Sequence, residues 1–207
     1  MSKKVFIFLS IIVLIAFELR FWQLGEVPPS PDWDEAALGY NAYSILETGR
    51  DEYEKFLPIV LRSFDDYKPA LYSYLIVPFI KLFDLNILSV RLPSAIFGTL
   101  TVLAVFFLVG ELFRKYESTQ IGKLINANVL ALLTSFLLAI SPWHIQFSRI
   151  AFESNVGLSL NIFAALFFIK SFKKPWLLLI SAFLIAINLY TYQSEKVFTP
   201  IFFIALI

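Results

Sequence analysis

Long apolar stretches constrain the fold of this chain more than any other feature of its sequence. Four of them follow residue 91, at residues 92–113, 124–141, 155–172 and 175–190. A helix needs about 20 consecutive, mostly apolar residues to cross the hydrocarbon core of a bilayer. Charged residues make up only 16% of the chain, against about 25% in soluble domains. The sequence therefore predicts an all-α, polytopic membrane protein.

Two further apolar stretches lie near the ends of the sequence. Two lysines precede an apolar run over residues 5–17, which extends to about residue 24 if Arg20 snorkels to the interface. No small-residue cleavage site follows, so we interpret residues 5–24 as a retained first span with a cytoplasmic N-terminus, rather than as a signal peptide. Residues 198–207 begin another span and stop about halfway. We interpret the chain as the N-terminal part of a longer protein.

The short apolar segment 70–83 decides the predicted topology. If it lies in the interface, the loops 114–123 and 170–174, each with three Lys or Arg, both face the cytoplasm. If it crosses, all six basic residues lie outside, against the positive-inside rule. We therefore expect residues 25–91 to form an external loop with interfacial helices, in which 70–83 lies in or dips into the outer leaflet. Residues 141–154 then share its external side.

Several functions are excluded by the residue types present. The chain has no cysteine, which excludes disulfides, thiol catalysis and zinc thiolate sites. A single histidine, His144, rules out a multi-histidine metal site. The net charge of +1 gives no indication of a nucleic-acid partner, because charge in membrane proteins mainly encodes topology. We expect no cofactor; the loop carboxylates permit a divalent metal, but nothing requires one.

Acidic residues gather in the first loop, since eleven of the 16 carboxylates lie between residues 18 and 66. Asp32 is placed to cap a helix that begins at Trp33, Glu35 completes a capping box, and Gly49 ends the helix. An apolar stripe along it predicts an amphipathic helix on the membrane surface, and its members are Leu38, Ala42, Ile45 and Leu46.

One carboxylate of this helix has no evident structural task. Capping alone explains Asp32 and Glu35 as well as a function does. Asp34 lies in the same first turn, where the helix dipole favours a carboxylate, yet it is not needed as a cap. Prolines at 28, 29 and 31 fix the approach of the chain. Asp34 is therefore the candidate for chemistry.

Two basic positions carry alternatives that the residues leave open. Lys68, beside Tyr67, precedes a proline that starts the segment 70–83. It either snorkels to lipid phosphate or holds the phosphate of a lipid-linked substrate. Arg149 stands four residues before Glu153, so the two form either a helical ion pair or part of a site. His144, in the same loop, is either a local hydrogen-bonding residue or a substrate contact.

At these residues the sequence resembles the GT-C membrane glycosyltransferases, specifically the protein O-mannosyltransferase and aminoarabinose (lipid A) transferase branch. The resemblance covers about residues 5–200 and rests on four motifs in order. They are Pro-Asp-Trp-Asp-Glu-Ala from Pro31, Tyr-Lys-Pro-Ala-Leu-Tyr from Tyr67, Arg-Leu-Pro-Ser-Ala from Arg91, and Ser-Pro-Trp-His from Ser141 with Ser148-Arg149.

The resemblance implies a GT-C transmembrane helix bundle that transfers a sugar from a polyprenyl-phosphate donor on the external face of the cell membrane. The acceptor is a protein, lipid or glycan. Asp34 matches the family's loop carboxylate, with Glu35 beside it, and both are candidate catalytic residues. Lys68 matches the lysine that contacts lipid phosphate. Glu153 falls, more loosely, where many relatives carry a second acidic residue.

A mechanism follows as a hypothesis. Asp34 is the general base for an acceptor hydroxyl, and Lys68, with Arg149 as the weaker candidate, neutralises the departing phosphate. Direct displacement inverts the anomeric centre. Tyr67, His144 and Glu153 complete the substrate-binding set. The alternatives are a flippase or transporter of lipid-linked sugars, which predicts ionisable residues near the membrane midplane, and a non-catalytic scaffold.

Overall fold

The computed structural model describes residues 2–63, 66–114 and 126–206. It is predominantly helical, which confirms the predicted all-α membrane fold. The described elements are, in chain order, α1 Lys3–Phe21, α2 Trp33–Thr48, β1 Val60–Ser63, β2 Asp66–Pro69, α3 Leu71–Phe83, α4 Ile87–Arg114, α6 Ala127–Ala139, α7 Pro142–Ser148, α8 Glu153–Ser171, α9 Leu177–Asn188 and α10 Glu195–Leu206. Apart from Arg114, the basic loop 114–123 lies outside the described residues.

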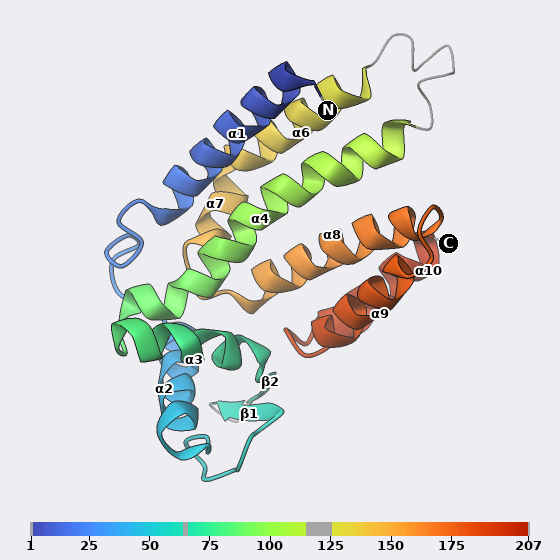
Figure 1. The fold of residues 1–207 in the computed structure, drawn as a ribbon. Coiled ribbons are helices and arrows are strands. Elements are labelled where there is room, and N and C mark those ends of the chain that lie inside the picture. The colour runs from blue at the N-terminus through green and yellow to red at the C-terminus, as the bar shows by residue number, and fades with distance from the viewer. Residues whose placement is uncertain (1, 64–65, 115–125, 207) are drawn as a thin grey trace.

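Helix α4 is the centre of the bundle. It is 28 residues long and packs against α1 and α6 on one side and α8 on the other, while α9 packs on the far side of α8 (Figure 1). Small residues mark its buried surface, among them Ser94, Ala95, Gly98 and Thr101. Small side chains let helix backbones approach closely where van der Waals packing, rather than expulsion of water, drives association.

Length and composition make two described helices, α4 and α8, able to cross a membrane. The pair α6 and α7 passes the same test as a unit bent by 60°, and α3 and α9 are shorter apolar helices. The 13 residues of α3 agree with the expectation that residues 70–83 are short for a span. Spans at residues 5–24 and 175–190 stay predictions.

The bend between α6 and α7 has a local cause. Pro142 lacks an N–H group and starts α7, so carbonyls at the end of α6 lose helical partners. The guanidinium of Arg20, on α1, donates to two of them, Leu138 O at 3.3 Å and Ala139 O at 3.1 Å. The idea that Arg20 snorkels to the interface is therefore wrong: the residue is fully buried.

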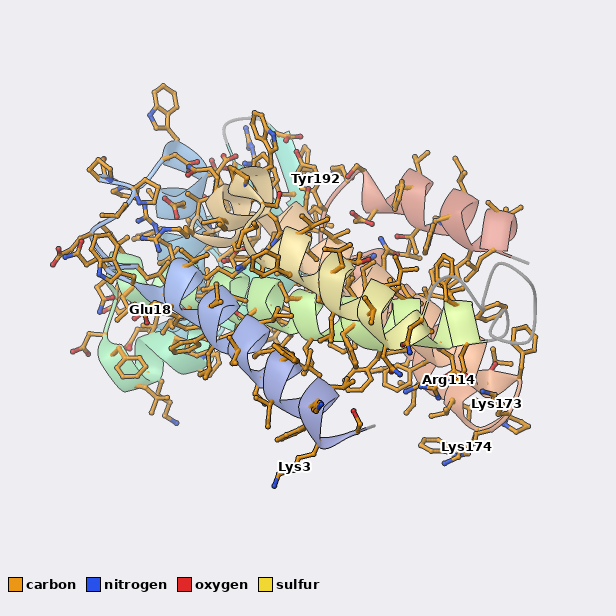
Figure 2. All side chains as sticks on the ribbon, turned by 90° about the horizontal axis from the view of Figure 1, so that it is seen from above. Lys3, Glu18, Arg114, Lys173, Lys174 and Tyr192 are labelled. Carbon is orange, nitrogen blue, oxygen red and sulfur yellow. The ribbon has the colours of Figure 1, made fainter. Side chains whose placement is uncertain are left out.

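Basic residues gather at one end of the bundle, and the acidic loop lies at the other. The N-terminus of α1 and the C-terminal ends of α4 and α8 lie at one end, whereas α2, β1, β2 and α3 lie at the other (Figure 1). Lys173, after α8, pairs with Glu111 of α4. Figure 2 shows Arg114, Lys173 and Lys174 together, far from Glu18. Arg114, the described residue of one predicted basic loop, thus lies at the same end as Lys173 and Lys174 of the other.

Helix α2 has the predicted boundaries. The capping box between Asp32 and Glu35 is present, and Gly49 ends the helix with φ at 70°, a left-handed conformation that glycine adopts at little cost. The apolar stripe, however, is used within the protein. Leu38 and Ala42 pack against Tyr72, Ile76 and Ile80 of α3 and against Val90 of α4. Tertiary packing thus covers the stripe that the sequence assigned to the membrane surface.

A short hairpin follows α2 and was not predicted. Strands β1 and β2 pair antiparallel, with Leu61 opposite Lys68 and Arg62 opposite Tyr67. Leu61 is buried, whereas Tyr67 is exposed. Four-residue strands carry too little alternation to be recognised in a sequence dominated by helical patterns. The hairpin matters because β2 carries Lys68.

We predict that Gly98→Ala destabilises the full-length protein by about 1–3 kcal/mol, the usual cost of overpacking. A methyl group at position 98 would lie 2.6 Å from Cβ of Ser148, where α7 crosses α4. Gly110→Ala, on the same helix, is the matched control, because its nearest neighbour is Cβ of Ala131 at 3.9 Å. Thermal unfolding in detergent measures both; equal midpoints would contradict the close contact.

Candidate active site

The site is organised by an ion pair between two segments of the acidic loop. Nζ of Lys68, on β2, contacts Oδ1 of Asp34, in the first turn of α2. The lysine side chain is 12% exposed and the aspartate side chain 54% exposed. Asp34 sits where a helix dipole favours negative charge, and Lys68 is held by the hairpin register. The two residues singled out for base and phosphate contact are thus neighbours.

A further acidic side chain lies near this pair. Glu153 begins α8 and is only 2% exposed. Its Oε1 has no hydrogen-bond partner within the described part of the chain. The charges of Lys68, Asp34 and Asp32 all act on it. An unsatisfied buried carboxylate oxygen is costly, so its presence beside a cation and a second carboxylate is typical of a functional site.

Two hollows lie beside α2, and Asp34 lines the smaller of them. A small cavity is lined by Asp34 and Lys68 together with Ala37, Leu38, Asn41, Leu61 and Ser63. A more open groove shares Ala37 and Ser63 with it and is otherwise lined by Trp33, Ala36, Tyr40, Glu52 and Tyr53. Aromatic side chains with a few convergent polar groups are the usual lining of binding sites.

Glu35 is engaged differently from Asp34. Its carboxylate is 2% exposed and completes the capping box at Asp32 N. It also accepts from Nε and Nη2 of Arg91, at 2.8 and 2.9 Å, and from the backbone N–H of Ala151 at 2.8 Å. Glu35 therefore connects α2, α4 and the turn before α8. These contacts make it a positioning group and leave Asp34 as the accessible carboxylate.

Arg149 holds the connection between α1 and α2. Its guanidinium donates to the carbonyls of Leu19, Trp22 and Val27, at 2.9, 2.7 and 2.8 Å. Burial lowers the pKa of Arg149, and the charge of Arg91 lowers it further. In the described part of the chain no ion pair joins Arg149 to Glu153, so the geometry does not favour the helical pair. It does not favour a phosphate contact either, because the guanidinium is bonded to protein carbonyls.

His144 is also held by protein groups. Its Nδ1 lies 2.7 Å from Nη2 of Arg20. Because an arginine only donates, Nδ1 is the acceptor and the ring proton is on Nε2. The side chain is 6% exposed. Of the two roles left open for His144, the local hydrogen-bonding one is favoured by these contacts.

Tyr67 reaches the site through its backbone. Its side chain is exposed, while its carbonyl accepts a hydrogen bond from Nε2 of Gln193, in the turn between α9 and α10. Sequence reasoning missed Gln193, and it gave Arg91 no role beyond a family motif. No local pattern marks either residue, because their partners lie far away along the chain.

The comparison with protein families decides the identity of the chain. Residues 67–207 match the model of the dolichyl-phosphate-mannose-protein mannosyltransferase family, which is more than half of the sequence. The chain belongs to this family. It is a membrane glycosyltransferase of a family that uses a lipid-linked mannose donor. The search of curated proteins and the search of solved structures gave no match.

The mannosyltransferase match begins at Tyr67 and so includes Lys68, His144, Arg149 and Glu153, whereas Asp34 precedes it. The aminoarabinose transferase branch stays a prediction. Within the described residues no three His, Asp or Glu side chains gather as metal ligands. The expectation that the protein requires no metal also stays a prediction.

We predict that Glu35→Ala lowers the stability of the protein, whereas Asp34→Asn does not. Removing one partner of a buried ion pair costs about 3–5 kcal/mol, so Glu35→Ala should lower the thermal midpoint of the full-length protein markedly. Asp34→Asn changes a half-exposed group and should change the free energy of unfolding by no more than about 0.5 kcal/mol, so its midpoint should stay close to that of wild type. Unfolding in detergent, followed by tryptophan fluorescence, tests this; similar losses in the two variants would contradict it.

Proposed function

We propose that this mannosyltransferase-family protein moves a sugar from a polyprenyl-phosphate donor to a hydroxyl group of its acceptor, with inversion, on the external face of the membrane. The observation that carries the proposal is the contact between Asp34 and Lys68. A base for the acceptor and a cation for the leaving group are the two parts that this reaction needs, and here they are adjacent.

In the proposed reaction the acceptor oxygen attacks the anomeric carbon while its proton moves to the carboxylate of Asp34. The bond between that carbon and the phosphate oxygen breaks, and its electron pair stays on the phosphate. Lys68 neutralises the charge that develops there. Because lysine is a mobile point charge, the phosphate can take it over from Asp34, which frees the carboxylate to act as a base.

The remaining predicted site residues support this pair in the proposal. Glu153 is buried, and the charges of Lys68 and Asp34 act on its carboxyl group; we assign it to donor binding. Tyr67 contributes through the strand that carries Lys68. Glu35, Arg149 and His144 fix the surrounding segments, since the Glu35 carboxylate, the Arg149 guanidinium and Nδ1 of His144 are hydrogen-bonded to protein groups.

The arrangement of charge supports the proposed sidedness. Lys3, Lys4, Arg114, Lys173 and Lys174 belong to the ends of α1, α4 and α8 that lie opposite the acidic loop (Figures 1 and 2). By the positive-inside rule that end is cytoplasmic. We therefore propose a multi-pass protein with a cytoplasmic N-terminus, whose Asp34 and Lys68 face outward. An acceptor would approach along the groove beside Trp33 and Tyr40.

We predict that Asp34→Asn lowers sugar transfer by about 10²–10⁴-fold, the usual contribution of a general base. The assay uses full-length protein in vesicles with a radiolabelled polyprenyl-phosphate mannose. Glu47→Gln, which neutralises an exposed carboxylate at the other end of α2, is the matched control and should keep wild-type turnover. Wild-type turnover in Asp34→Asn would reject the base; donor crossing the bilayer without cleavage would indicate a flippase.

We predict that Lys68→Ala weakens donor binding by about 10–100-fold, the loss expected for a charged hydrogen bond of about 1.5–3 kcal/mol. Lys68→Arg keeps the charge, so its affinity for the donor should be at most about threefold to tenfold weaker than that of wild type. Titration of the donor into nanodisc-held protein measures both affinities. Equal effects of the two substitutions would favour a lysine that merely meets membrane lipid.

A further inference from the structure

The segment that carries Lys68 is held on both sides by one turn of the chain. On one side, Nε2 of Gln193 donates to the carbonyl of Tyr67. On the other, the backbone N–H of Leu71 donates to the carbonyl of Tyr190 at 3.4 Å. Both partners belong to residues 189–194, the turn between α9 and α10. That turn lies next to β2 and α3 (Figure 1), and the ring of Tyr192 contacts that of Phe152, beside Glu153.

A buried polar cluster fixes this turn to the bundle. The carboxylate of Glu195, 6% exposed, receives three hydrogen bonds at Oε2. The donors are Asn161 of α8 at 2.7 Å, Asn188 of α9 at 3.1 Å and Thr199 of α10 at 2.9 Å. Thr191, in the turn itself, donates to the carbonyl and side chain of Asn188. One carboxylate oxygen thereby joins three helices and the turn between two of them.

The cluster is closely packed. A methyl group at Gly157, on α8, would lie 2.8 Å from the Glu195 carboxylate, so glycine is the residue that lets the carboxylate approach the helix. Within the described residues Glu195 makes no ion pair, and its hydrogen-bond partners are neutral. Burying a carboxyl group is costly unless it is hydrogen-bonded, and a buried network of hydrogen bonds favours one arrangement of the elements that it joins. The cluster is therefore suited to setting the position of the turn.

We propose that the α9–α10 turn is the positioning element of Lys68: Gln193 orients the strand through Tyr67, and Glu195 anchors the turn. This inference rests on the proposed function, because it assumes that Lys68 binds the donor phosphate. Gln193 and Glu195 are positioning residues and touch no substrate in this scheme.

The test measures the affinity of full-length protein in nanodiscs for undecaprenyl phosphate. Gln193→Met keeps the length of the side chain and removes its donor, so binding should weaken about tenfold, within the range that misplacement of a binding group causes. Gln193 is exposed, and the thermal midpoint should stay unchanged. Ser194→Ala, an exposed position of the same turn, is the matched control and should bind like wild type.

A double-mutant cycle shows whether Gln193 acts through Lys68. In a Lys68→Met background, Gln193→Met should change affinity by less than about twofold, since groups that act as one unit are not additive. In transfer assays the donor KM should rise while the acceptor KM stays constant. A tenfold loss in both backgrounds, or none in either, would overturn the inference. Wild-type affinity and transfer in Lys68→Met alone would instead reject the proposed function.

Discussion

The buried side chain of Arg91 is the contact on which the site depends. All five of its N–H groups are used: two on the carboxylate of Glu35, and three on the carbonyls of Leu24, Pro28 and Ser30. A buried ion pair offsets its desolvation only with such complete bonding. Because Glu35 also accepts from Ala151, one guanidinium joins α4 to the start of α2 and to the approach to α8. The position of Asp34, one residue before Glu35, follows from it.

Local signals were sufficient for much of the fold. The capping box and Gly49 gave both boundaries of α2, because cap and turn preferences depend only on neighbouring residues. Length and hydropathy predicted α4 and α8 to within a few residues of Ile87–Arg114 and Glu153–Ser171. The same reasoning placed Asp34 and Lys68 in one loop with family motifs, but it could not show that the hairpin between β1 and β2 brings them into contact.

Roles that depend on distant partners could not be read from the sequence. The spacing of Arg149 and Glu153 suggests a helical ion pair, yet Arg149 binds carbonyls near the end of α1, more than 120 residues earlier in the chain. Arg20 shows the same effect, since the interruption of the helix at Pro142 supplies acceptors that no pattern around Arg20 announces. Glu195 had no place in the predicted site because its partners come from three helices.

The basic residues of the site divide by how firmly they are held. Arg91 and Arg149 are buried, and they donate five and three hydrogen bonds to protein acceptors. Loss of these bonds would leave buried charge unpaired, which is strongly destabilising. Lys68 meets a carboxylate that is 54% exposed, and ion pairs of that kind contribute only about 0–1 kcal/mol. A phosphodiester carries the same single negative charge as a carboxylate, and a phosphate monoester carries up to about two. The contact between Lys68 and Asp34 is therefore weak enough for the proposed donor phosphate to replace it, while Arg91 and Arg149 keep their hydrogen bonds to the surrounding segments.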